Sequence, residues 1–145
     1  DNNMGRSWMW AAKRLGFTLA LAGPERALPK PETLAALDCP NIICTTDAEE
    51  AVRDCTVINT DTWISMGQEA EKGTKEKAFF PYQVNAELLR VAAPGYSVFH
   101  CLPAYRGYEI TDEVLEANAP VIFTEAENRL HAQKAVLYTL ATSNC

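Results

Sequence analysis

The stretch that decides the fold is Tyr96-Ser97-Val98-Phe99-His100-Cys101-Leu102-Pro103, an apolar run that ends in a thiol and a proline. The apolar part, residues 96–99, predicts a buried strand, and the tetrad His100–Pro103 places Cys101 at its carboxyl end. Ligands of open α/β sheets bind at that edge, whereas a thiol in mid-strand is most simply explained by packing. The stretch therefore indicates a parallel sheet with a site at its edge.

Strands and helices alternate on both sides of this stretch. Apolar runs predict further strands over residues 17–22, 41–44, 56–59 and 120–123. Apolar periodicity and caps predict helices over residues 4–15, 31–37, 48–53, 85–93 and 112–118 and from 124 onward. Short crossovers between parallel strands are right-handed and cover both faces of a sheet. We therefore predict one α/β domain over residues 1–145, a doubly wound parallel sheet flanked by helices in a Rossmann-like three-layer fold.

Two segments stand apart from this alternation. The passage from residue 60 to about residue 77 is polar and rich in Gly, Lys and Glu, which predicts a long mobile loop. At the amino end a helix begins almost at once, although Asp1-Asn2-Asn3 resembles the turn that follows a strand. We expect that the first strand of the sheet is missing, unless Asp1 is simply a helix cap.

Composition narrows the class of protein. The chain has 145 residues, 48% of them hydrophobic, which is enough for one full core. Its 19 acidic and 13 basic side chains give a net charge of −6 without a basic stripe, which argues against nucleic acid as a partner. No apolar stretch approaches the roughly 20 residues of a membrane span, and the first residues lack the charged and apolar regions of a signal peptide. We expect a soluble intracellular protein.

The cysteines predict no disulfide framework and no metal site. There are five at irregular spacings, Cys39, Cys44, Cys55, Cys101 and Cys145. An odd number fits reduced thiols in a cytosol-like compartment. A structural zinc site usually has paired C-x-x-C spacing, and the first three cysteines instead look like strand and loop residues.

Polar side chains recur where the predicted strands end. They lie in four segments, residues 1–3, 61–67, 101–102 and 125–129, and include carboxylate, amide, hydroxyl, thiol and guanidinium groups. Amides and a helix N-terminus suit a carboxylate, and Asp61 suits an ammonium group. The rim therefore favours a zwitterion, and an amino acid is the natural ligand.

Three of these motifs together resemble ornithine carbamoyltransferase, in its ornithine-binding half. They are the tetrad His100–Pro103, the loop 61–67 and Glu125-Ala126-Glu127-Asn128-Arg129, and the resemblance covers essentially the whole chain. In that family the δ-amine of L-ornithine attacks the carbonyl carbon of carbamoyl phosphate, giving citrulline and phosphate without a metal or organic cofactor. The resemblance also implies a homotrimeric full-length enzyme, in the cytoplasm or in the mitochondrial matrix of a eukaryote.

The resemblance implies a role for each rim residue. The ornithine-binding residues would be Asn3, Asp61, Ser65 and Met66, the last two from a loop that closes over the amino acid. Those at carbamoyl phosphate would be Cys101, the Leu102 carbonyl and Arg129. The catalytic groups would be Cys101, Asp61 and Arg129. The family's carbamoyl phosphate domain carries Ser-x-Arg-Thr-Arg and His-Pro-x-Gln segments, which this chain lacks, so we expect the chain alone to be inactive.

Elementary chemistry supports two of these roles. An alkylammonium group with a pKa near 10.4 must lose a proton before it can attack. A Cys101 thiolate could accept that proton but would also stabilise the ammonium, so the sign of its effect stays open. Arg129 would neutralise charge on the carbonyl oxygen, and losing such a donor typically costs about 10² to 10³ in rate.

Simpler interpretations stay open beside these. Cys101 could be a packing residue, Asp61 a turn cap, and Arg129 a partner of Glu125 at i, i+4 spacing. Neighbouring strand residues point to opposite faces, so His100 cannot pair with Cys101 and is expected in the core. His131 is expected at the surface, and Trp8 and Trp63 are expected to be packing anchors. The alternative functions are carbamoyl transfer to another amine, such as putrescine or an acylated ornithine, and a non-catalytic amino-acid-binding module.

Overall fold

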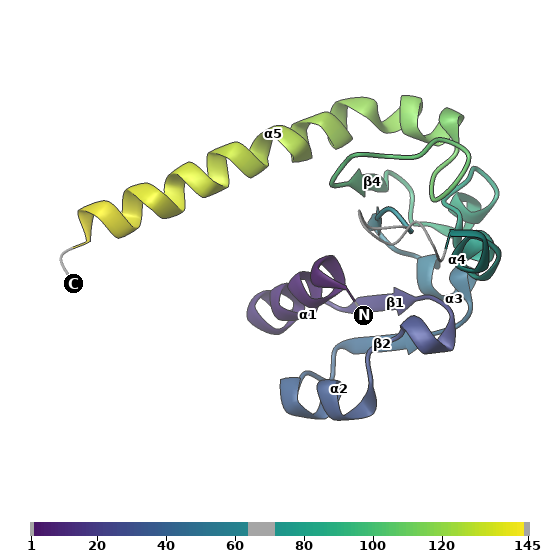
Figure 1. The fold of residues 1–145 in the computed structure, drawn as a ribbon, viewed down its shortest axis with the longest axis horizontal. Helices are drawn as coiled ribbons and strands as arrows, with labels where there is room; N and C mark the ends of the chain where they lie inside the picture. Colours follow the sequence, from purple (N-terminus) through teal and green to yellow (C-terminus); the bar gives the residue numbers. More distant parts are fainter. Residues whose placement is uncertain (1, 64–71, 144–145) are drawn as a thin grey trace.

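The computed structural model describes residues 2–63 and 72–143 and is an α/β fold in which parallel strands are flanked by helices (Figure 1). Helix α1 (Asn3–Leu15) comes first. The side chain of Asn2 caps it by accepting the Gly5 N–H at 2.8 Å, and Gly16 ends it with a φ of 77°. The predicted helix and its glycine stop are confirmed, since both depend on local signals.

The strands form two parallel pairs. In the first, β1 (Leu19–Ala22) pairs with β2 (Ile42–Thr45), and the 3-10 turn η1 (Glu25–Ala27) and helix α2 (Pro31–Leu37) connect them. In the second, β3 (Val57–Thr60) pairs with β4 (Ser97–His100). The parallel α/β class is confirmed. Among the described residues, however, the strands make two sheets of two rather than one continuous sheet.

Short helices link β2 to β3 and β3 to β4. They are α3 (Ala48–Val52), α4 (Lys72–Phe79), η3 (Phe80–Tyr82) and η4 (Leu88–Val91). The predicted cap of α3 is confirmed, because Asp47 accepts the Glu49 N–H at 2.9 Å. The predicted helix over residues 85–93 shortens to η4, since the Asn85 side chain accepts the Leu88 N–H and starts a tight turn. The predicted loop to residue 77 is partly wrong, because its last residues form α4; residues 64–71 lie outside the described part of the chain.

The hydrophobic core lies beneath the second strand pair. It is made by the buried side chains of Val52, Ile58, Val84, Leu89, Val98, Ile110, Val114, Leu115 and Ile122. Along β4 the buried residues are Val98 and His100, which alternate with partly exposed neighbours as the period of two requires. The core thus fixes the carboxyl end of β4, where the tetrad begins.

The C-terminal part of the chain differs most from the prediction. Helix α5 (Asp112–Thr142) is continuous and contains Pro120, so neither a strand at 120–123 nor a break before residue 124 exists. Ile122 explains the difference, because helical spacing from Val114 places both buried on the face that meets β4. Tertiary packing therefore overrides the β propensity of the run 121–123.

The second half of α5 projects away from the rest of the molecule (Figure 1). It carries large apolar side chains that are more than half exposed, namely Leu130, Val136, Leu137, Tyr138 and Leu140. None of the helices that the structure describes is both long and apolar enough to cross a membrane.

Candidate functional site

Asp61 lies at the centre of the predicted rim and joins three elements. It follows β3, and its Oδ1 accepts a hydrogen bond from the Cys101 thiol, just after β4, at 3.3 Å. Its Oδ2 accepts one from the side-chain amide of Asn2, the cap of α1, also at 3.3 Å. The structure therefore brings together the carboxylate and the thiol that sequence reasoning paired at one edge.

The amide that contacts Asp61 belongs to Asn2, whereas the family resemblance points to Asn3. Asn3 is the first residue of α1 and is exposed. The two residues differ in backbone conformation. Asn2 is the cap, with an extended backbone and a side chain that folds back across the end of α1, whereas Asn3 is already helical. Ser65 and Met66 lie outside the described residues.

The surroundings of Cys101 keep its thiol protonated at neutral pH. Burial, followed by the charge and hydrogen bond of Asp61 and the charge of Glu125, raises its pKa to about 12. Glu125 accepts the backbone N–H of His100 at 2.8 Å, and burial raises the pKa of this carboxyl as well. In this structure the Cys101 thiol is a hydrogen-bond donor to Asp61.

His100 is fully buried, as expected of a core histidine, and its ring nitrogens face Leu102 and Glu109. Its Nδ1 accepts the backbone N–H of Leu102 at 2.9 Å, and its Nε2 lies 3.0 Å from Glu109 Oε1. The same Glu109 oxygen accepts the Tyr105 N–H at 2.6 Å. Sequence reasoning missed Glu109, which is only 1% exposed, because an acid in a polar loop carries no signal of burial.

Arg129 stands apart from this cluster. It is exposed on α5, and within the described parts of the chain it makes no hydrogen bond or ion pair, including the i, i+4 pair with Glu125. Residues four apart share a face of a helix, so Arg129 lies one turn, or about 6 Å, beyond Glu125. Its guanidinium is exposed to solvent one turn beyond the residue that contacts the tetrad.

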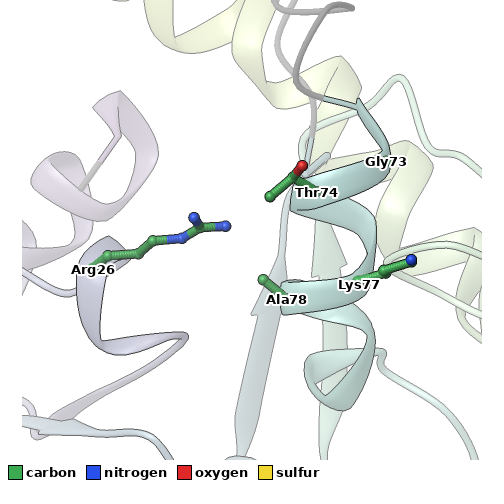
Figure 2. Close-up of a pocket in the computed structure, with 5 residues that line it drawn as sticks. All are labelled: Arg26, Gly73, Thr74, Lys77 and Ala78. Carbon is green, nitrogen blue, oxygen red and sulfur yellow. The ribbon is translucent and has the colours of Figure 1, made fainter.

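Two hollows of the described structure have linings that do not include Asp61 or Cys101. One of about 770 Å³ lies between η1 and α4. Arg26 points across it toward Thr74 and Ala78, but Lys77 points away, so the two cations do not converge on a ligand (Figure 2). Another, of about 430 Å³, is lined in part by Trp63.

Both tryptophans that the sequence marked as anchors pack against other rings. Trp63 stacks on Phe79 with ring centres 6.3 Å apart and meets Tyr108 edge-on at 6.4 Å. Trp8 meets Phe17 edge-on at 6.1 Å. His131 is exposed on α5 and lies 3.3 Å from Glu127, as its surface assignment predicts.

The described residues hold no group of three or more His, Cys, Asp or Glu side chains able to bind a metal ion. Cys39, Cys44, Cys55 and Cys101 are free thiols. The described groups at the rim are the Asp61 carboxylate, the Cys101 thiol and the Asn2 amide, which together offer acceptors to a cation and donors to a carbonyl or carboxylate.

Parallel strands that bring these groups together at their carboxyl ends define an α/β domain with polar side chains gathered at the edge where ligands of such folds bind. The chain belongs to the aspartate/ornithine carbamoyltransferase family, because residues 1–140 match the model of that family's Asp/Orn binding domain.

Individual relatives agree with this family assignment. An ornithine carbamoyltransferase of Akkermansia muciniphila is 69% identical over 141 residues, which are 97% of this chain and 46% of that protein. A catabolic ornithine carbamoyltransferase of Thermoplasma volcanium is 48% identical, over 96% of this chain and 48% of that protein. The crystal structure of the anabolic enzyme of Campylobacter jejuni superposes with a TM-score of 0.88 and 39% identity, over 99% of this chain and 49% of that one. The chain thus spans about half the length of the relatives it matches.

Proposed function

We propose that this chain is the ornithine-binding domain of an ornithine carbamoyltransferase, and that a carbamoyl phosphate domain elsewhere in the complete protein completes the site. The observation that carries the proposal is the contact of the Cys101 thiol with Asp61 at the shared edge of β3 and β4. The relatives from Akkermansia muciniphila and Thermoplasma volcanium are named for ornithine, which supports that amino acid over aspartate.

The charge of the rim also favours ornithine. Asp61 and Glu125 face the tetrad, and Cys101 stays protonated between them. Such a site attracts the ammonium groups of ornithine. It disfavours the side-chain carboxylate of aspartate, since like charges at close range repel. Asp61 then holds the α-ammonium group, the Asn2 and Asn3 end of α1 faces the α-carboxylate, and Ser65 and Met66 complete the ornithine contacts.

The reaction forms one bond and breaks another. The free δ-amine attacks the carbonyl carbon of carbamoyl phosphate, the C–N bond forms, the C–O bond to phosphate breaks, and the proton that the amine loses leaves with the phosphate. The Cys101 thiol and the Leu102 carbonyl align the carbamoyl group and the amine. Arg129 neutralises the oxygen that gains charge, which is the electrostatic task of an oxyanion hole. Because the Cys101 thiol is protonated, it does not accept the amine's proton.

Titration calorimetry tests the amino-acid site in this chain. We expect ornithine to bind, and Asp61→Asn to weaken it roughly 10- to 100-fold, because a hydrogen bond to a charged group contributes about 1.5 to 3 kcal/mol. Asp38→Asn is the matched control, since Asp38 caps α2 in a left-handed conformation that asparagine tolerates. Preference for putrescine or N-acetylornithine over ornithine would contradict the substrate assignment.

A chimera tests the complete reaction. In it, this chain replaces the aligned 141-residue segment of the Akkermansia muciniphila enzyme, whose remaining half supplies a partner domain. We expect citrulline from the chimera and none from the isolated chain. A folded chimera that binds ornithine without forming citrulline would instead support a non-catalytic amino-acid-binding module.

Assembly and location follow from the family resemblance and remain part of the proposal. We expect the complete enzyme to be a homotrimer that works in the cytoplasm, or in the mitochondrial matrix of a eukaryote. Light scattering of the chimera tests the first expectation, and imaging of the complete protein in its own cells tests the second.

A further inference from the structure

We propose that His100 and Glu109 are positioning residues, which hold the Cys101–Leu102 turn in its reactive shape through a buried relay from Glu109 Oε1 through the imidazole to the Leu102 N–H. The proposal rests on the proposed carbamoyl transfer, since it concerns the same rim. Both side chains are at most 1% exposed, so they act on the rim through Leu102 and not by contact with a ligand.

The turn requires such support. Leu102 has a φ of 55°, in the left-handed region that a branched side chain rarely occupies. A residue there costs on the order of 1 to 3 kcal/mol and persists only where surrounding contacts fix it. The same residue presents the carbonyl that we place beside the δ-amine, so an error in its conformation moves a group of the site.

The hydrogen bonds fix the proton on the imidazole. A backbone N–H can only donate, so Nδ1 of His100 accepts from Leu102 at 2.9 Å and carries no proton. The ring hydrogen is therefore on Nε2, which lies 3.0 Å from Glu109 Oε1. Glu109 thus selects the one neutral tautomer that leaves Nδ1 free for Leu102.

A second hydrogen bond anchors Glu109 itself. Its Oε1 also accepts the Tyr105 N–H at 2.6 Å, which connects the relay to the loop that follows the tetrad. Both ends of the turn, at Leu102 and at Tyr105, therefore reach the same buried pair. If His100 and Glu109 had only a structural role, they would stabilise the fold but would not set the geometry of the Cys101–Leu102 turn.

Two substitutions of His100 separate positioning from stability. His100→Asn keeps an acceptor near the place of Nδ1 but loses the contact with Glu109, whereas His100→Gln keeps a donor near the place of Nε2 but loses the acceptor for Leu102. Each removes one buried hydrogen bond, so similar losses of thermal stability are expected. Only His100→Gln should let the Cys101–Leu102 turn change its conformation.

The chimera with the Akkermansia muciniphila half is the enzyme for this test, with citrulline formation as the readout. We expect His100→Gln to lower kcat about 10²-fold, as a displacement of about 1 Å can do, with a small effect on the KM for ornithine. His100→Asn and Glu109→Gln, which each retain one required acceptor, should lose less than tenfold. The matched controls are His131→Asn and His131→Gln at the exposed histidine of α5, which should leave kcat unchanged.

A kcat that falls equally in His100→Asn and His100→Gln would overturn the proposal, as would losses that merely follow the melting temperatures. Nitrogen-15 NMR of the unsubstituted chain at pH 7 tests the relay without any variant. We expect a proton on Nε2, none on Nδ1, and slow exchange of the Leu102 amide; a protonated Nδ1 would refute the relay. An unsubstituted chimera that forms no citrulline would contradict the proposed function, while the NMR result would still decide the relay.

Discussion

The most direct consequence of the site is that Cys101 should be nearly inert toward alkylation, although it is partly exposed. Its pKa of about 12 leaves roughly 10⁻⁴ of the molecules as thiolate at pH 8. Only the thiolate reacts, so iodoacetamide should modify Cys101 about 10³-fold more slowly in the folded chain than in the chain unfolded in urea. Peptide mass spectrometry after timed quenching follows this one cysteine among the five.

The pH dependence separates charge from access. Steric shielding lowers the rate at every pH, whereas a raised pKa moves the plateau of the rate. We expect the rate for Cys101 to keep rising tenfold per pH unit beyond pH 10, where an ordinary thiol with a pKa near 8.5 has levelled off. A plateau below pH 10 would show that burial and Asp61 do not hold this thiol protonated.

Removing the charge of Asp61 should accelerate the reaction. At 3.3 Å from the thiol, one charge contributes roughly 1.3 kcal/mol even with the full screening of water, which is about a tenfold change in rate. Asp61→Asn should therefore react at least about tenfold faster than the unsubstituted chain at pH 8. Asp38→Asn, which makes the same change in net charge on α2, should react like the unsubstituted chain. Equal rates in the two variants would show that Asp61 does not control the thiol.

Three further predictions concern the helix that packs over β4. Burial raises the pKa of Glu125 above its unfolded value, so the native state loses stability as pH rises through that pKa. Glu125→Gln cannot ionise, and its advantage in urea unfolding over the unsubstituted chain should therefore grow as pH increases from 4 to 7; a constant difference would contradict this. Pro120→Ala should stabilise the chain by up to about 3 kcal/mol and raise its helical circular dichroism, because proline removes a hydrogen bond from inside α5. An unchanged urea midpoint would favour a strand at residues 120–123. Ile122→Ala should destabilise by about 2 to 5 kcal/mol, since this side chain is fully buried, whereas Val136→Ala on the exposed half of α5 should stay within about 0.5 kcal/mol. Similar losses of stability in these two variants would show that the buried and exposed parts of α5 are assigned incorrectly.

The parts of the fold that the sequence predicts are those set by local chemistry. Asp47 caps α3 and Gly16 ends α1 because a cap needs only a side-chain oxygen or a left-handed glycine at one position. The run Val121-Ile122-Phe123 has a composition typical of a strand, and nothing within it records that Ile122 meets β4. Its helical state is decided by residues distant in sequence, which periodicity over a short window cannot detect.

The residues of the site also divide into those that the sequence predicts and those that depend on contacts distant in sequence. Asp61 and Cys101 could be predicted to meet because each follows a strand, and parallel strands bring their carboxyl ends to one edge. The contact of Asn2 with Asp61 could be predicted only from the cap geometry of α1. Glu109 could not be predicted, because its burial depends on a loop that returns beneath the tetrad to reach His100.

Three carboxylates surround the end of β4, and each takes a different donor of the tetrad. Asp61 accepts the Cys101 thiol, Glu125 accepts the His100 backbone N–H, and Glu109 lies against the His100 ring. This half of the site therefore has a surplus of negative charge, which suits an amine and repels a phosphate. Arg129 lies one helical turn beyond Glu125, and one arginine does not match the charge of carbamoyl phosphate. The electrostatics of the rim thus require that most of the phosphate-binding cations come from outside this domain, as the proposed two-domain enzyme supplies.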